Sequence, residues 1–142
     1  MNFELPKIVV GVTDFARLMA LAEASTKKSP AVAETLAREL DRAQVKPDHK
    51  LASNIVKMGS ELTYKTTNGE QRRVKLVYPC DADISTGKIS ILSPIGAALI
   101  GLSVGQSINW STPGGSTHLL TIVSVTDDRD FTSRAAMENL AC

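Results

Sequence analysis

The loop around residue 83 carries the side chains whose spacing comes nearest to a metal site. Asp81, Asp83 and Ser85 stand at alternate positions, and oxygen atoms spaced in this way can ligate Ca²⁺. A helix–loop–helix calcium site also needs glycine at the sixth loop position and a bidentate acid at the twelfth. Those positions hold Thr86 and Leu92. The sequence therefore favours an ordinary acidic loop over a calcium site.

The histidines and cysteines show no arrangement typical of a catalytic or metal centre. His49 and His118 lack partners at the spacing of zinc ligands. Cys80 and Cys142 are the only cysteines, and this sparse usage is typical of a reducing cytoplasm. A Cys80–His118 nucleophile pair stays open, but no motif supports it. We expect no catalytic residue, no metal and no cofactor.

The glycine-rich stretch 113–115 does not have the pattern of a phosphate-binding loop. Pro113-Gly114-Gly115 lacks the lysine and the hydroxyl residue of such a loop. A predicted strand follows it, where a phosphate site would use the N-terminus of a helix. Trp110, the only tryptophan, lies on an alternating strand and is interpreted as a packing residue. The sequence predicts a protein that is not an enzyme.

Composition excludes several broad classes of protein. The chain has 142 residues, 43% of them hydrophobic, with 16 basic and 15 acidic side chains and a net charge of +1. This balance argues against a protein that mainly grips nucleic-acid phosphates. No apolar stretch approaches the roughly 20 residues of a membrane span, and no signal-peptide pattern is present. We expect a soluble cytoplasmic protein of one medium-sized or two small domains.

The first third of the chain is predicted to form two short helices. Phe15, Leu18, Met19 and Ala22 recur at helical spacing after the capping residues Thr13-Asp14. Ser29-Pro30 then starts a second helix, with serine as its cap and proline at its first position. Helices joined by so short a connection form an antiparallel hairpin.

Beyond Pro47 the hydrophobic period changes from 3.6 to 2, which predicts strands. We expect a first short strand over 55–58, a hairpin that turns at Asn68-Gly69, and two last strands over 107–111 and 117–125. The predicted fold class is α+β, with a mostly antiparallel sheet and one embedded short helix. The predicted units are residues 1–46, 47–126 and a tail over 127–142, where a frayed helix is expected at 132–140.

Between the predicted hairpin and the last strands, Ser93-Pro94 forms a corner. Proline cannot extend a central strand, but it is well placed in a first helical turn. The small and apolar residues 95–100 follow, and Gly101 and Gly105 redirect the chain. The pattern predicts a strand, a sharp corner and one or two buried helical turns.

This stretch resembles the C-terminal domain of the Gre-type transcription factors. The shared residues are Ser90-Ile-Leu-Ser-Pro-Ile-Gly-Ala-Ala-Leu-Ile100, Gly105 and Thr112-Pro-Gly-Gly115; Gln106 stands where an acidic residue is usual. The resemblance covers about the last 90 residues up to Val125. It implies an FKBP-like fold, a bent antiparallel sheet around a short helix. It also implies docking on the β′ subunit of bacterial RNA polymerase, at the rim of the secondary channel.

With its short helix pair, the chain is similar to the Rnk family over nearly its whole length except the tail. The name of this family refers to regulation of nucleoside diphosphate kinase. Gre cleavage factors carry a long coiled coil with an acidic pair at its tip, which holds a catalytic magnesium ion. Here the hairpin is much shorter and its tip reads Ala24-Ser-Thr-Lys-Lys-Ser-Pro30, with Glu23 and Glu34 as the nearest carboxylates. Residues 37–44 and Leu76-Val-Tyr-Pro79 also resemble the Rnk pattern, and this family lacks the cleavage tip.

The resemblance implies a non-catalytic regulator that binds RNA polymerase and competes with Gre factors without stimulating transcript cleavage. The expected docking residues are Ser93, Pro94 and Ile95, and the expected hairpin tip is Lys27, Lys28 and Ser29. Contact with DNA would be indirect, through the polymerase. Two alternatives stay open. One is an FKBP-like peptidyl-prolyl isomerase or peptide-binding module, and the other is a direct regulator of a nucleotide-metabolism kinase.

Overall fold

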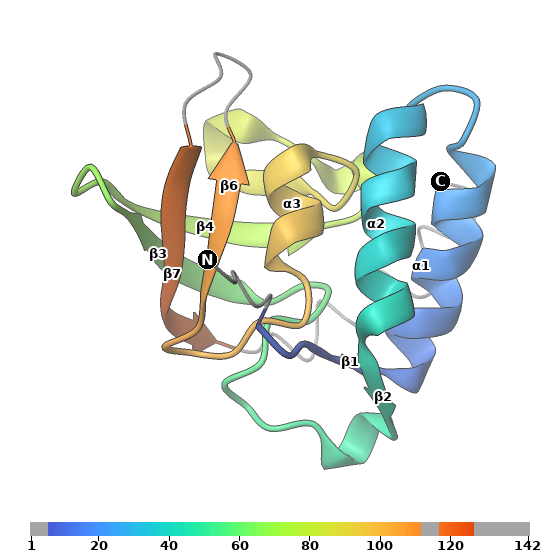
Figure 1. Cartoon of the computed structure of the whole chain (residues 1–142), viewed down its shortest axis with the longest axis horizontal. Helices are drawn as coiled ribbons and strands as arrows, with labels where there is room; N and C mark the ends of the chain where they lie inside the picture. The colour runs from blue at the N-terminus through green and yellow to red at the C-terminus, as the bar shows by residue number, and fades with distance from the viewer. Residues whose placement is uncertain (1–5, 112–116, 127–142) are drawn as a thin grey trace, which may run out of the picture.

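The computed structural model describes residues 6–111 and 117–126, which form an α+β fold of three α-helices and a mixed sheet (Figure 1). The predicted turn at 112–115 and the predicted tail helix lie outside these residues. The elements, in chain order, are β1 (Val9–Gly11), α1 (Val12–Ala24), α2 (Pro30–Arg42), β2 (Gln44–Lys46), η1 (Asp48–Lys50), β3 (Glu61–Thr66), β4 (Gln71–Val77), η2 (Pro79–Asp81), η3 (Ile84–Thr86), β5 (Lys88–Ser90), α3 (Pro94–Leu99), β6 (Ser107–Ser111) and β7 (Thr117–Thr126).

Helices α1 and α2 lie side by side and run in opposite directions (Figure 1). Leu18, Leu36 and Leu40 are buried between them and the rest of the molecule, as the helical spacing predicts.

Three details differ from the prediction. Met19 faces outward. Gly11, and not Thr13-Asp14, occupies the N-cap position of α1, so the N-cap residue itself provides no side-chain hydrogen bond. Ser29 occupies the N-cap position of α2, but its side chain makes no capping hydrogen bond.

The main sheet has the strand order β5-β4-β3-β7-β6. Strands β3 and β4 form the hairpin predicted at Asn68-Gly69, and β6 pairs antiparallel with β7. The expectation of an antiparallel sheet is wrong at one edge, because β5 runs parallel to β4. The chain between them passes through η2 and η3 and thereby returns β5 in the same direction as β4.

The strand predicted over 55–58 does not form. Ile55 makes only an isolated bridge with Ser103, and the chain then turns at Gly59, which has a φ of 85°. The apolar side chains of Ile55, Val56 and Met58 are nevertheless buried, and the last two belong to the main core cluster. The apolar pattern over residues 55–58 therefore indicates buried side chains, although the segment pairs with no neighbouring strand.

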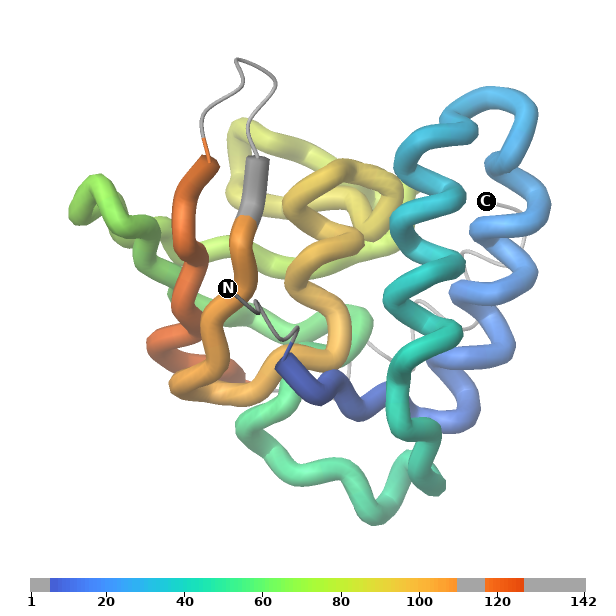
Figure 2. Tube along the Cα trace, in the orientation of Figure 1, coloured from blue at the N-terminus to red at the C-terminus, as the bar shows by residue number. Residues whose placement is uncertain are grey.

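A short N-terminal strand connects the helices with the sheet. Strand β1 pairs in parallel with β2, and the Val9 N–H donates to the carbonyl of Gly101 at 3.1 Å. Figure 2 shows this blue segment passing from the end of α3 to the base of the helix pair. Ile8 and Val10 are buried in the same cluster as Leu36 of α2 and Leu120 of β7. The described part of the chain therefore has one continuous core.

Candidate functional site

The corner at Ser93 is built by the side chain of that serine. Its Oγ accepts a hydrogen bond from the Gly96 N–H at 3.0 Å and donates to the Ser90 carbonyl at 2.7 Å. The first bond caps helix α3, and Pro94 occupies the first helical position. Pro94 is exposed, whereas Ile95 is half-buried against the core. Ser93 therefore shapes the corner, and Pro94 is the residue that the corner presents to solvent.

Gly96 allows the corner to close this tightly. A Cβ atom at this position would lie 2.1 Å from the Ser90 carbonyl oxygen. Gly96 is itself buried, so a side chain could not turn toward solvent. The small residue after Ser-Pro-Ile is thus required by the close approach of strand β5 to helix α3.

A pocket of about 510 Å³ opens beside the corner. Ser93 and Ile95 line it, together with Tyr64 of β3 and Ile89 of β5. Its walls come from the β3–β4 hairpin, the chain from Ala82 to Ser90 and the start of α3. In Figure 2 the yellow-green 79–90 segment and the start of α3 lie side by side. The predicted docking corner therefore forms one wall of a cavity with an apolar floor.

Charged side chains surround this apolar floor. Arg72, Lys88 and Glu70 line the pocket, and the imidazole ring of His118 lies beside them in the lining. The Arg72 Nε lies 3.8 Å from the Glu70 Oε2, and both side chains are more than half exposed. An exposed pair at this separation contributes little to stability. The guanidinium group is therefore accessible to a ligand in the pocket.

Ile84 lies on the edge of the pocket and is 90% exposed. Its loop is closed by a pair of backbone hydrogen bonds between Asp83 and Lys88, at 2.9 and 3.0 Å. The Asp83 carboxylate also accepts bonds from the N–H and the hydroxyl of Ser85. The hydroxyl is the main reason why the pKa of Asp83 is lowered. These bonds fix the backbone on both sides of Ile84.

The side chains of the acidic loop form hydrogen bonds within the loop itself. The Asp83 oxygen considered as a ligand forms hydrogen bonds with its own loop. Within residues 6–111 and 117–126, no three His, Cys, Asp or Glu side chains form a group that could hold a metal ion. What the loop contributes to the site is Ile84, which the sequence reasoning missed. The signal was present, as a large apolar residue between Asp83 and Ser85.

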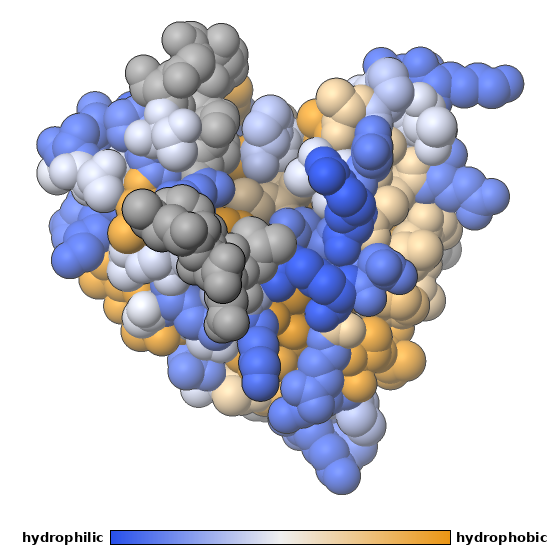
Figure 3. Space-filling model, viewed as in Figure 1, coloured by the Kyte–Doolittle hydropathy of each residue, from blue (hydrophilic) through white to orange (hydrophobic). Residues whose placement is uncertain are grey.

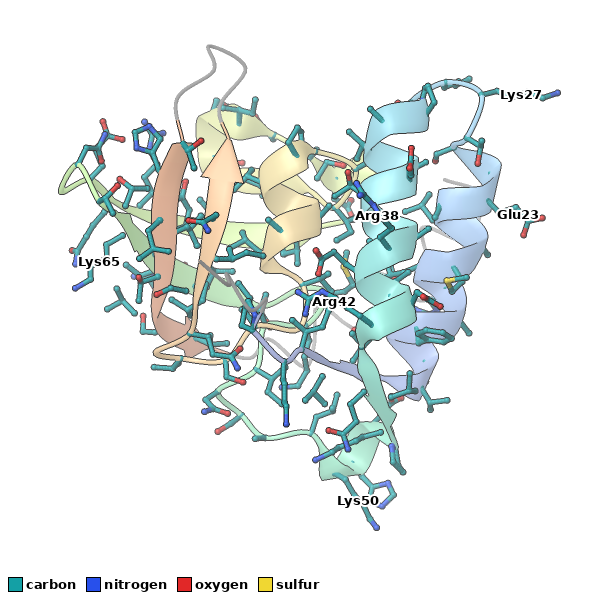
Figure 4. The ribbon with its side chains drawn as sticks, in the orientation of Figure 1. Glu23, Lys27, Arg38, Arg42, Lys50 and Lys65 are labelled. Atoms are coloured by element: carbon teal, nitrogen blue, oxygen red, sulfur yellow. The ribbon has the colours of Figure 1, made fainter. Side chains whose placement is uncertain are left out.

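The predicted hairpin tip lies at a different place from the corner. Lys27 and Lys28 are exposed in the connection between α1 and α2, and Ser29 is half-buried. Figure 4 shows Lys27 pointing away from the molecule and Glu23 projecting outward from α1. Hydrophilic side chains project at the same end of the helix pair in Figure 3. None of these residues lines the pocket, so the tip and the corner are separate surfaces.

A part-buried polar cluster links α1 to the chain around Met58 and to Tyr78 after β4. The Asp14 Oδ2 accepts a hydrogen bond from the Met58 N–H at 3.3 Å. Burial raises the pKa of Asp14 to about 6, and repulsion from Asp48 adds to this effect. Burial likewise raises the pKa of Tyr78 to about 12, with the Asp14 charge as a second cause. The cluster lies at the helix–sheet junction and does not line the pocket, so we interpret it as structural.

Two family models together match almost the whole described chain. Residues 6–45 match the Rnk N-terminus, and residues 51–127 match the C-terminal domain of the GreA/GreB transcription elongation factors. No helix among the described residues has the length and apolar character needed to cross a membrane.

Several known proteins are similar to this chain. The regulator of nucleoside diphosphate kinase from Escherichia coli K12 is 38% identical over 116 residues, which are 80% of this chain and 85% of that protein. Transcription elongation factor GreA from Beijerinckia indica is 33% identical over 73% of this chain and 66% of its own. A solved structure of a GreA/GreB elongation factor from Nitrosomonas europaea has a TM-score of 0.69 and 39% identity. The match covers 87% of this chain and all of that one.

Proposed function

The chain belongs to the family of Rnk regulators and GreA/GreB transcription elongation factors, and from this premise we propose that it binds bacterial RNA polymerase as a non-catalytic regulator. Its docking surface is the corner Ser93-Pro94-Ile95, which contacts the β′ subunit at the rim of the secondary channel. The observation that carries the proposal is the exposed Pro94, held next to an apolar pocket by the cap of Ser93.

The sheet and α3 form the docking module in this proposal, with an FKBP-like arrangement. A five-stranded sheet packed against one short helix supports this interpretation. Helices α1 and α2 form a short coiled-coil hairpin that enters the channel only part of the way. The match to the Rnk N-terminus over residues 6–45 supports a hairpin of this length.

Lys27 and Lys28 make the hairpin tip basic. Positive charge at this position repels a magnesium ion, since Mg²⁺ is held through carboxylate oxygens. The protein therefore occupies the polymerase site without stimulating transcript cleavage, and it competes there with Gre factors.

A binding assay with purified core RNA polymerase tests the proposal. Pro94→Glu removes the apolar corner while keeping a residue that suits the first helical turn, where acidic side chains are favourable. We expect this variant to lose polymerase binding. Pro47→Glu is the matched control, because Pro47 is also exposed and does not line the pocket. Equal binding by both variants would remove the assigned surface.

Two further measurements separate this function from its alternatives. Displacement of a Gre factor from polymerase by the wild-type chain is expected, and enhanced cleavage in a stalled elongation complex would contradict the non-catalytic role. The name of the Escherichia coli relative refers to nucleoside diphosphate kinase. Binding to that purified kinase, in the absence of polymerase, would instead favour direct regulation of an enzyme.

A further inference from the structure

The pocket beside the corner combines two kinds of recognition chemistry. Tyr64, Ile89 and Ile95 provide apolar surface, and Ile84 adds an apolar side chain at the edge. A volume of about 510 Å³ lies in the ordinary range for ligand sites. It is large enough to receive one or two side chains of another protein.

Ile84 is the feature that most needs a partner. Single exposed apolar residues are common on protein surfaces, but this one is 90% exposed and lies on a loop closed by hydrogen bonds on both sides of it. A backbone shift that moved Ile84 toward the core would break those bonds. Covering it by a partner would remove apolar area from water at little further loss of conformational entropy.

The charges around the pocket favour a partner with negative charge. Among the described residues of the lining, Arg72 and Lys88 are the cations and Glu70 is the anion. The Asp83 carboxylate, next to Ile84, interacts with Lys88 from outside the lining, so Arg72 is the principal site for a partner's carboxylate. The Arg72–Glu70 separation of 3.8 Å leaves the guanidinium able to bind a second carboxylate. A partner with negative charge beside an apolar side chain would match both features of the site.

We propose that the pocket binds a peptide segment of a partner protein, in which an aliphatic side chain packs against Ile84, Ile89 and Ile95 and a neighbouring carboxylate pairs with Arg72 and Lys88. This assigns binding and specificity roles to Ile84, Arg72 and Lys88. The identification of polymerase as the owner of that segment rests on the proposed function. The binding site itself is tested without polymerase.

The probes are two short peptides that differ only in charge. N-acetyl-Glu-Leu-Glu-amide and N-acetyl-Lys-Leu-Lys-amide are titrated separately into the isotope-labelled full chain, and backbone amide shifts are followed by NMR. We expect the acidic peptide to shift the amides of Ile84, Lys88 and Ile89, with a dissociation constant of about 1 mM. The basic peptide is expected to bind at least about tenfold more weakly, because of its charge.

Two variants test the separate parts of the site. Ile84→Ser should weaken binding of the acidic peptide about tenfold, because the apolar contact is lost. Its matched control is Val104→Ser, at an exposed apolar residue outside the pocket. Arg72→Glu should reverse the preference and favour the basic peptide. The control for this change is Lys65→Glu, at an exposed residue on the same hairpin that does not line the pocket (Figure 4).

Three outcomes would overturn the inference. One is equal affinity for the two peptides, and another is no shift at the pocket amides. The third is tighter binding of an oligothymidylate at those same amides, which would indicate a nucleic-acid site. If the peptides bind as expected but polymerase does not, the proposed function fails and the peptide site stands. If polymerase binds and Ile84→Ser leaves the peptide affinity unchanged, the proposed function stands and the peptide site fails.

Discussion

At the residue scale, Asp14 shows how folding changes the chemistry of one side chain. The carboxyl group is held between α1 and the chain at Met58, with Arg17 and Lys57 as nearby cations and Asp48 as a nearby anion. Its desolvation outweighs the hydrogen bond and the two cations. The pKa therefore rises from 3.8 to about 6.

This shift predicts how stability depends on pH. The folded chain keeps the Asp14 proton up to about pH 6, whereas the unfolded chain loses it near 3.8. The free energy of unfolding contributed by this group is thus fully present below pH 4 and falls as pH rises to 6. Asp14→Asn removes the charge, and we expect it to raise the free energy of unfolding at neutral pH by at most about 3 kcal/mol. Urea unfolding at about pH 4 and about pH 8 measures the free energy of unfolding of the variant and of the wild type. The difference between the two proteins should vanish at the lower pH.

Asp83→Asn is the control with the opposite sign. Hydrogen bonds from Ser85 lower the pKa of Asp83, so its contribution is present at neutral pH and is lost as pH falls through that lowered pKa. At neutral pH, the Asp83→Asn variant should therefore be less stable than the wild type. A loss of stability in Asp14→Asn at about pH 8 would mean that the pairing of Asp14 with Arg17 and Lys57 outweighs its desolvation.

Gly96 gives a second prediction at this scale. Gly96→Ala places a Cβ where the Ser90 carbonyl oxygen lies, so β5 and α3 must separate. Overpacking of this kind costs about 1–3 kcal/mol of stability. In thermal unfolding, the melting temperature of Gly96→Ala should be lower than that of Ser93→Ala. The serine variant loses only the cap of a short helix, which costs about 1 kcal/mol. Wild-type stability in Gly96→Ala would contradict the close approach.

At the element scale, helix α1 is capped by a residue far away in the sequence. The Asp48 Oδ1 accepts from the Thr13 N–H at 3.2 Å, and its Oδ2 accepts from the Thr13 hydroxyl. Gly11 makes room for this carboxylate, because a Cβ there would lie 2.6 Å from the Asp48 Oδ1. The segment after β2 therefore provides the cap that the helix's own N-terminus lacks.

We expect Asp48→Ala to destabilise the protein by about 1 kcal/mol, the usual effect of removing a helix cap. Amide hydrogen exchange in the first turn of α1 should increase. Asp48→Asn keeps an acceptor oxygen and should retain most of the protection, which separates loss of the hydrogen bond from loss of the charge. If both variants exchange like the wild type, Asp48 is not the cap.

At the scale of the whole molecule, the N-terminal segment holds the helix pair on the sheet. The Pro6 carbonyl accepts from Arg42 of α2, and the Lys7 carbonyl accepts from the Gln106 side chain at 3.0 Å. Ile8, the residue that follows them, is 1% exposed. Figure 4 shows Arg42 directed from α2 toward this segment. The helices and the sheet are thus linked through one buried strand.

This arrangement predicts a single cooperative unfolding transition for the helices and the sheet. Ile8→Ala should lower the free energy of unfolding by about 2–5 kcal/mol, whereas Val9→Ala, at a half-buried position in β1, should have a smaller effect. Hydrogen exchange of α2 and β3 amides with increasing urea should give one midpoint. Separate midpoints for the two groups would show that residues 6–46 unfold as an independent unit.

Local patterns in the sequence predicted most of the elements. The helical spacing of Leu18, Leu36 and Leu40, the turn at Asn68-Gly69, and the proline in the first turn of α3 all act over a few residues. Their physical causes are local backbone preferences and one-sided burial, so each was predicted correctly. The family resemblance is carried by the same local stretches and is confirmed by the matches over 6–45 and 51–127.

Only the tertiary structure decided which of these elements meet. The parallel pairing of β5 with β4, the absence of a strand over 55–58 and the remote cap from Asp48 depend on contacts between distant segments. The same is true of the pocket, where Ile84, Arg72 and Ile95 come from three separate stretches of the chain. Local propensity does not encode such meetings, because they arise when a common core is closed around all the elements at once. The sequence by itself thus determined most of the elements and the family. The tertiary structure placed an exposed isoleucine and two cations around the predicted docking corner.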